Sequence, residues 1–251
     1  MPATALRISY GPDPDQYAEL TLPENGAVQA TVVIIHGGYW RAAYDADLGR
    51  PLAADLAARG FAAWNLEYRR AGKGGGWPET FTDVCAGLDA LVPAAREHTL
   101  DLSRVVLLGH SAGGHLAVLA AARTGSPIVP AGVVSQSGVL NLAEAHRLGL
   151  SGKAVENFLG CSPEQDPRRY READPVNALP LQVPVWALHG DEDSTVPLSC
   201  SSSWVEAARA SGSPAQLRLI PGDHFAMITP GTPAWAAVVE VVREAAGLPA
   251  F

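Results

Sequence analysis

The segment 109–113, which reads Gly-His-Ser-Ala-Gly, carries the clearest signal for chemistry in the sequence. An aliphatic run, 105–108, precedes it, and an alanine- and leucine-rich segment that favours a helix follows it. Strand, sharp turn and helix in this order are typical of the G-x-S-x-G nucleophile elbow, which exposes a serine hydroxyl above a sheet. We therefore predict that Ser111 is a nucleophile. The alternative is an ordinary glycine-containing turn with a capping serine.

Serine is a weak nucleophile unless a base removes its proton, and the usual base is a histidine oriented by a carboxylate. The chain contains seven histidines. Of these, His224 lies in the loop after the last expected strand and downstream of an acidic loop. That acidic loop offers Asp191 and Asp193, and strand placement alone does not choose between them. A serine, an aspartate and a histidine in this chain order are typical of enzymes that carry the elbow.

The segment 36–40, His-Gly-Gly-Tyr-Trp, follows a continuously apolar run and is a candidate for the second part of an oxyanion hole. Its two glycines allow the backbone to turn N–H groups toward a substrate oxygen. We expect the N–H groups of Gly38 and Tyr39 to act beside that of Ala112, which begins a helix. Trp40 is expected to pack beneath the loop. An ordinary strand-end turn is the alternative interpretation.

Strands and helices alternate from residue 31 onward, which indicates an α/β fold with a mainly parallel sheet and helices on both faces. Catalytic groups in such folds lie in loops at the carboxyl ends of strands, where the segments above fall. Two alternating runs before residue 31 predict an edge hairpin. The expected strands are 6–10, 17–22, 31–36, 61–67, 105–108, 131–139, 183–189 and 216–220, and the expected helices, besides the one after the elbow, are 48–59, 78–98, 199–211 and 233–246.

Residues 141–180 differ in character from the rest of the chain. They contain four prolines, many charges and short helical patterns, but no convincing strand. A chain of 251 residues can bury its core as one domain. We therefore interpret 1–251 as a single domain and 141–180 as a small helical cap or lid inserted within it.

The composition limits the partners of this chain. The formal net charge is −8, and no lysine or arginine cluster is long enough for a phosphate-binding surface, so we expect neither nucleic acid nor anionic membranes. The N-terminus lacks the pattern of a signal peptide, and no stretch approaches the ~18 apolar residues of a membrane span. We expect a cytoplasmic protein with a small-molecule substrate, and a monomer and a homodimer both remain open.

Metal chemistry is disfavoured by the spacing of the candidate ligands. The three cysteines, Cys85, Cys161 and Cys200, are far apart and form no C-x-x-C pair, which argues against a zinc site or a disulfide framework. His110 and His115 are five residues apart and fall on different helical faces. We predict no metal and no cofactor.

Three of these segments resemble one family. His-Gly-Gly-Tyr-Trp at 36–40 is similar to the HGGxW motif of kynurenine formamidases (arylformamidases) within the α/β-hydrolases, and the segments 109–117 and 223–225 resemble that family's elbow and histidine loop. Tyr68-Arg69, Pro78 and Asp83 follow the spacing of the wider hormone-sensitive-lipase-like esterases. The resemblance runs from about residue 30 to the end and implies an α/β-hydrolase fold. The family pattern H-G-x-x-D-x-x-V-P fits 189–197 only with Asp193 as the acid.

The resemblance implies a serine hydrolase that removes a small acyl group, formyl included, from an arylamide or aryl ester such as N-formylkynurenine. Ser111, His224 and Asp193 would form the catalytic triad. Tyr39, Trp77 and Phe225 come from loops near the expected site and could stack against an aryl ring, although Trp77 could equally anchor the start of a helix. The alternatives are a general short-chain carboxylesterase and, in a different class, a non-catalytic receptor on the same fold, which the three intact triad candidates disfavour.

Overall fold

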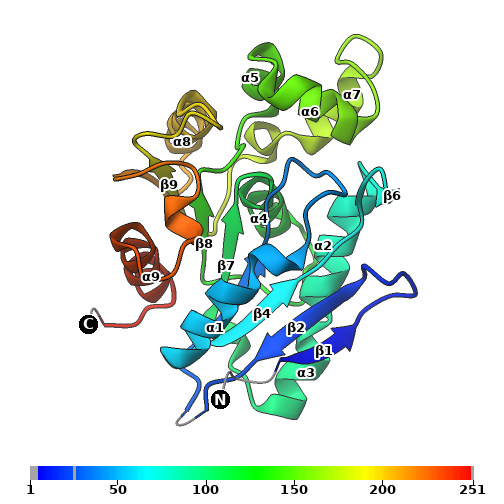
Figure 1. Cartoon of the computed structure of the whole chain (residues 1–251). Coiled ribbons are helices and arrows are strands. Elements are labelled where there is room, and N and C mark those ends of the chain that lie inside the picture. Colours follow the sequence, from blue (N-terminus) through cyan, green and yellow to red (C-terminus); the bar gives the residue numbers. More distant parts are fainter. Residues whose placement is uncertain (1–4, 25–26, 250–251) are drawn as a thin grey trace.

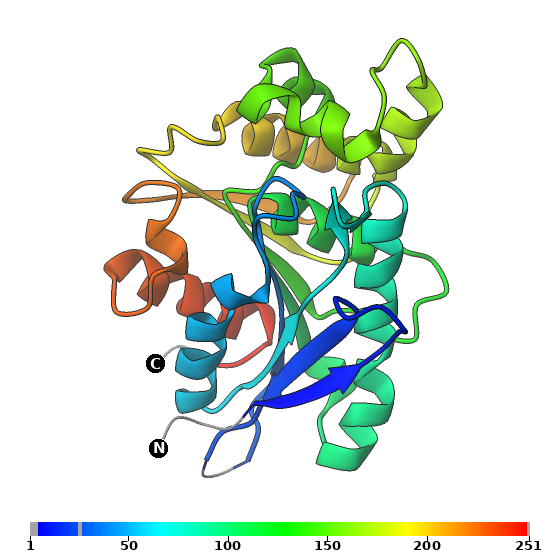
Figure 2. The same cartoon turned by 45° about the vertical axis from the view of Figure 1, so that its right-hand side comes forward.

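The computed structural model describes residues 5–24 and 27–249, and within these ranges eight strands form one central sheet (Figures 1 and 2). The strands are β1 (Leu6–Ser9), β2 (Tyr17–Thr21), β3 (Thr31–Ile35), β4 (Ala62–Leu66), β7 (Val105–His110), β8 (Gly132–Gln136), β9 (Val185–Gly190) and β10 (Ala215–Ile220). Their order across the sheet is β1-β2-β4-β3-β7-β8-β9-β10. The pairs β1–β2 and β2–β4 are antiparallel and all other neighbours are parallel, as the alternating pattern predicts. Two-residue strands β5 (Arg70–Ala71) and β6 (Gly74–Gly75) form a separate small pair.

The central strands are buried on both faces, which explains why they read as unbroken aliphatic runs. Every residue of β3 and of β7 is buried. Because side chains alternate along a strand, Val33 and Leu107 enter the core on one face of the sheet, and Val32 and Val106 enter the core on the other. The loops that leave the carboxyl ends of these strands are therefore anchored from both sides.

Helices cover the two faces of the sheet. One face packs against α1 (Arg50–Ala58) and α9 (Pro233–Ala245), and the other packs against α2 (Glu79–Asp89), α3 (Leu91–His98), α4 (Ala112–Ala122) and α8 (Ser199–Ala210) (Figure 1). Within the described ranges, no helix combines the length and apolarity that crossing a membrane requires.

The expected single helix 78–98 is wrong, because the structure divides it at Ala90 into α2 and α3. Pro93 lies in the first turn of α3. Its ring excludes the helical carbonyl four residues earlier, that of Asp89, and it has no N–H to donate. The helix therefore restarts just before Pro93.

The cap segment, which we define as residues 141–180, contains helices and turns without a strand. It comprises α5 (Leu142–Arg147), α6 (Leu150–Leu159), α7 (Pro167–Ala173) and a 3₁₀ turn, Pro175–Ala178. Figure 1 shows it above the end of the sheet from which α4 departs. Ser151, Gly152 and Lys153, at the start of α6, have left-handed backbone angles with φ of 47°, 60° and 65°.

Candidate active site

The predicted elbow is a sharp turn between β7 and α4. Ser111 stands between them with φ 55° and ψ −118°, a conformation that side-chain-bearing residues rarely adopt. The flanking glycines are required by close backbone contacts. A Cβ on Gly109 would lie 2.3 Å from the carbonyl oxygen of Gly113, and a Cβ on Gly113 would lie 2.0 Å from that of Ile35. The turn thus holds Ser111 in a single strained position.

His224 and Asp193 lie in direct contact beside this turn. The Nδ1 of His224 and the Oδ2 of Asp193 are 2.7 Å apart, and both side chains are almost completely buried. The other carboxylate oxygen of Asp193 accepts the backbone N–H groups of Thr195 and Val196 at 2.8 and 2.9 Å. Because Nδ1–H donates to the carboxylate, the Nε2 of His224 is left as the basic nitrogen.

Asp193 is built to stay ionised. Burial works to raise the pKa of its carboxyl group, but hydrogen bonds from His224, from the Val196 N–H and from Ser137 outweigh burial and hold that pKa well below its usual range. A carboxylate is therefore present opposite His224 at neutral pH. It can orient the imidazole and stabilise an imidazolium.

Asp191, the second candidate acid, faces away from His224. Asp191 is exposed to solvent, and its Oδ1 accepts the backbone N–H of Gly222 at 2.9 Å. This bond ties the loop after β9 to the turn after β10. Of the two aspartates, the structure therefore brings Asp193 to His224 and leaves Asp191 as a turn residue.

The loop after β3 packs directly against the elbow. A Cβ on Gly37 would lie 2.8 Å from the carbonyl oxygen of His110 and 3.0 Å from the Cβ of Ser111. Gly38, Tyr39 and Trp40 follow with φ of 110°, 54° and 57°. The loop thus reaches Ser111 because residue 37 has no side chain.

Three backbone N–H groups next to Ser111 are free to bind an oxygen. Among the described residues, no hydrogen bond uses the N–H of Gly38, of Tyr39 or of Ala112. Ala112 is the first residue of α4, where an N–H has no partner within the helix. This is the donor type that binds a developing oxyanion in acyl transfer.

A buried polar network holds the loop after β3 from below. The His36 ring is stacked on Tyr68 with centroids 4.3 Å apart, and its Nε2 lies 3.1 Å from the Oε1 of Glu67. Glu67 also accepts the Ala46 N–H at 2.8 Å and pairs with Arg70. Burial lowers the pKa of His36 to about 4, so the ring is neutral at pH 7.

Trp40 and the Arg69–Asp83 pair, which the sequence singles out, also hold the loops around the site in place. Trp40 is fully buried, stacks on Phe158 of the cap segment at 4.7 Å and donates its Nε1–H to His115, which agrees with the packing role expected for it. Arg69 makes a paired salt bridge with the buried Asp83. Sequence reasoning missed Glu67 and Arg70. Their one sequence signal is their position beside Tyr68-Arg69.

The three aromatic candidates differ in their surroundings. Phe225 is 55% exposed, and its ring meets that of His224 edge-on at 5.2 Å. Tyr39 is partly exposed and contacts Ser151 of the cap segment. Trp77 instead packs on Phe81 and Phe158. The structure therefore brings Phe225 to His224, places Tyr39 beside Ser151 of the cap segment, and associates Trp77 with α2 and the cap segment.

Metal ligands do not gather in the part of the chain that the structure describes, where no three His, Cys, Asp or Glu side chains are placed to share an ion. His110 and His115 are engaged elsewhere, each through its Nε2 with a backbone carbonyl, those of His224 and Ala173 respectively.

One protein family matches most of this chain. The profile of the BD-FAE family matches residues 19–207, which include Ser111 and Asp193 and end before His224. The chain belongs to the BD-FAE family. Curated proteins are also similar to the chain. Isoprenylcysteine alpha-carbonyl methylesterase ICME of Arabidopsis thaliana is 30% identical over 240 residues, covering 86% of this chain and 55% of that protein. Esterase LipC of Mycobacterium tuberculosis is 24% identical over 221 residues, covering 81% and 55%. The chain thus spans about half the length of these curated relatives.

Solved structures place this BD-FAE chain among the α/β-hydrolases by fold. Esterase B of Lactobacillus rhamnosis superposes with a TM-score of 0.85 at 22% identity, covering 98% of this chain and 86% of that one. A truncated carbohydrate esterase from gut microbiota superposes with a TM-score of 0.80 at 21% identity, covering 98% and 97%. The predicted α/β-hydrolase fold is confirmed.

Proposed function

We propose that this chain is a serine hydrolase of carboxylic esters in which Ser111, His224 and Asp193 form the catalytic triad. The observation that carries the proposal is the 2.7 Å contact between His224 Nδ1 and the buried Asp193 carboxylate beside the strained Ser111 turn. Membership of the BD-FAE family and the esterase names of its relatives support the same reaction class.

The reaction follows from the positions of these groups. Ser111 Oγ attacks the substrate carbonyl while His224 Nε2 takes its proton, and Asp193 stabilises the resulting imidazolium. The N–H groups of Gly38, Tyr39 and Ala112 bind the oxyanion. His224 then gives the proton to the leaving group, and water releases the acyl group from Ser111 by the same steps. His224 carries every proton transfer and the backbone N–H groups bind the oxyanion, so the scheme uses no cofactor.

We further propose a small acyl group and an aromatic leaving group. Ser111 is only 2% exposed and lies beneath a loop that the cap segment contacts at Ser151, which favours a short acyl chain. Phe225 offers aromatic surface beside His224, and Tyr39 offers it on the loop after β3. An arylformamide such as N-formylkynurenine is the second candidate substrate, supported by the His-Gly-Gly-Tyr-Trp segment at 36–40.

The test is a rate comparison on one set of substrates. Purified protein is assayed with p-nitrophenyl esters from acetyl to octanoyl and with N-formylkynurenine, with Ser111→Ala as the control. We expect the highest kcat/KM for the shortest esters. A higher kcat/KM for octanoyl than for acetyl would contradict the acyl preference, and a higher value for N-formylkynurenine than for any ester would assign the formamidase activity. A receptor would hydrolyse none of them and would not be labelled by a fluorophosphonate probe.

A further inference from the structure

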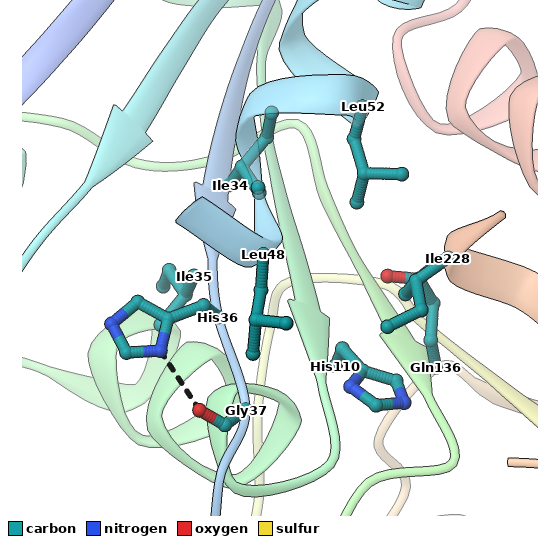
Figure 3. Close-up of a pocket in the computed structure, with 10 residues that line it drawn as sticks. Ile34, Ile35, His36, Gly37, Leu48, Leu52, His110, Gln136 and Ile228 are labelled. Carbon is teal, nitrogen blue, oxygen red and sulfur yellow. Dashed lines mark hydrogen bonds between the residues drawn. The ribbon is translucent and has the colours of Figure 1, made fainter. Parts of the chain in front are cut away.

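His110 and Gln136 are two buried polar side chains that the proposed chemistry does not use. They end the neighbouring parallel strands β7 and β8 and are register partners in the sheet. His110 is 5% exposed and Gln136 is 1% exposed. Both residues therefore lie at the carboxyl end of the sheet, the end at which Ser111 follows β7. Figure 3 shows them on the same side of a small internal cavity.

Both side chains donate a hydrogen bond to the turn that carries His224. The Nε2 of His110 lies 2.9 Å from the carbonyl oxygen of His224, and the Nε2 of Gln136 lies 2.6 Å from that of Met227. Two donors from adjacent strands thus reach two carbonyls that are three residues apart. Other hydrogen bonds of this turn run to the neighbouring loop at Asp191, Glu192 and Asp193, or join residues of the segment 222–232 to one another.

We propose that His110 and Gln136 are positioning residues that set the place of His224 relative to Ser111. The inference rests on the proposed role of His224 as the base. The bond to Asp193 fixes one nitrogen of the His224 ring, but it leaves the backbone of the residue to be placed. His110 and Gln136 supply that placement from the same sheet that carries Ser111. The nucleophile and the base thereby share one rigid support.

His110 is suited to this role because it stays neutral. Burial, and secondarily the nearby His224, lower its pKa to about 3. The rings of His110 and His224 have centroids 4.5 Å apart. A cationic residue at position 110 would oppose the charge that His224 acquires during the reaction, whereas a neutral imidazole donates Nε2–H without that repulsion. Its Nδ1 faces Gly37, where a Cβ would come within 2.9 Å.

Gln136 is oriented by the bond that it makes. Because Met227 presents a carbonyl oxygen, the amide of Gln136 must turn its NH₂ group toward it. The Oε1 is then buried without a hydrogen-bond partner among the described residues. It lines the cavity of Figure 3 with apolar side chains that include Ile34, Leu52 and Ile228, in a space about the size of one water molecule. Replacing Gln136 by an apolar residue removes the donor to the Met227 carbonyl together with the unpaired Oε1.

The experiment uses three variants and one matched control. His110→Phe keeps a planar ring and removes the donor, His110→Gln keeps an N–H at similar reach, and Gln136→Met keeps the length without polar atoms. The control is Trp64→Phe, which loses a buried side-chain N–H bond to the Gly87 carbonyl elsewhere in the core. For each purified variant, kcat, KM, the rate of fluorophosphonate labelling and the melting temperature are measured.

We expect His110→Phe and Gln136→Met to lower kcat about 10- to 100-fold, the scale of a displaced catalytic group. KM should stay within about threefold, because the substrate contacts are untouched, and the labelling rate should fall in parallel with kcat. His110→Gln should retain kcat within about fivefold of wild type. Trp64→Phe should lower the melting temperature by a similar amount while kcat stays within about twofold.

Two outcomes overturn the inference. In the first, folded His110→Phe and Gln136→Met both retain wild-type kcat. In the second, Trp64→Phe loses as much kcat as they do, which makes the effect a general loss of stability. If the two apolar variants do not fold, His110→Gln decides: a loss above 100-fold in this donor-bearing variant contradicts the inference. Failure of the proposed function is a separate result, in which Ser111→Ala still hydrolyses esters.

Discussion

The loops at the carboxyl ends of the strands and the cap segment are held by different kinds of contact. Around Ser111 and His224 the bonds are buried and many end on backbone atoms, as in the bonds from Asp193 to two N–H groups. In the cap segment, ion pairs such as Arg147–Glu144 and Arg168–Glu172 lie on the surface, with the arginines 67% and 80% exposed. Exposed pairs contribute about 0–1 kcal/mol each, whereas buried bonds fix geometry. Buried bonds thus fix the geometry around Ser111 and His224, whereas these surface ion pairs contribute little to holding the cap segment.

The two regions also share unusual backbone conformations, but with different support. Ser111 has a positive φ between a strand and a helix that are both buried. Ser151 and Lys153 have positive φ on the cap segment, where Arg41 from the loop after β3 bonds both the Oγ and the carbonyl of Ser151. Arg41 therefore connects the loop after β3 to the cap segment, and we call this Arg41–Ser151 contact the joint. Substitutions in the first region should affect kcat, and substitutions at the joint should affect KM and substrate range.

The largest effect should come from Ser111→Ala. Alanine keeps the Cβ, so the strain at residue 111 and the fold should be unchanged, with a melting temperature close to that of wild type. Loss of the nucleophile should lower kcat by about 10⁶-fold, the scale found for a triad serine. Steady-state kinetics on p-nitrophenyl acetate measures this. Activity within tenfold of wild type would exclude Ser111 as the nucleophile.

The paired substitutions Asp193→Asn and Asp191→Asn should separate by orders of magnitude. Asparagine at 193 cannot stabilise the His224 imidazolium and favours the wrong tautomer, so kcat should fall about 10⁴-fold. Asparagine at 191 can still accept the Gly222 N–H through its carbonyl oxygen, so kcat should fall tenfold or less. Kinetic measurement of both purified variants decides the assignment. A crippled Asp191→Asn beside an active Asp193→Asn would reverse it.

Much of the first region could be predicted from the sequence, because its chemistry depends on short local patterns. The elbow at 109–113 is a strand, a turn and a helix in sequence, and the choice of Asp193 over Asp191 came from the resemblance of residues 189–197 to the family pattern. Chain order was enough to single out His224. The central strands followed from unbroken apolar runs, since a strand such as β3 is buried on both faces.

The contacts that join distant residues could not be predicted in this way. The bond from Gln136 to Met227 spans 91 positions, and which side chain donates to which carbonyl depends on strand register and rotamer. Trp77 comes from a loop near the site in sequence terms, yet its ring packs on Phe158 of the cap segment. The predicted helix 78–98 runs through Pro93, and the break between α2 and α3 lies just before that proline.

Acid should lower the stability of the fold, because three buried histidines are held neutral in it. Burial lowers the pKa of His36 and His115 to about 4 and that of His110 to about 3, against about 6.5 in an unfolded chain. Below pH 6.5 the unfolded state binds protons that the folded state does not, so stability that is complete above 6.5 is lost as the pH falls toward 3. At pH 5 the loss is about 2 kcal/mol for each histidine. The lowered pKa of Asp193 acts in the same direction at lower pH.

Urea unfolding at pH 7.5 and pH 5.0 measures this loss. His115→Gln is the matched variant, because it removes one of the three buried imidazoles away from the His224 contact. The variant should lose less stability than wild type between the two pH values. A free energy of unfolding that is unchanged between pH 7.5 and pH 5.0 would show that these rings are not held neutral by burial.

The smallest effect should come from the joint, through Arg41→Ala. This substitution removes the bonds to Ser151 and the cation contact with the Tyr39 ring, whose centroid lies 5.5 Å from the guanidinium carbon. The triad and the backbone donors keep their supports, so kcat on the acetyl ester should stay within about threefold, since the substitution moves no catalytic group. The start of α6 should loosen from the loop, which should raise KM a few-fold and narrow the difference in kcat/KM between acetyl and octanoyl esters.

Arg168→Ala, which breaks an exposed ion pair within the cap segment, is the control and should leave KM and the acyl preference unchanged. A large loss of kcat in Arg41→Ala with an unchanged acyl preference would mean that Arg41 supports the oxyanion donors themselves and belongs to the first region.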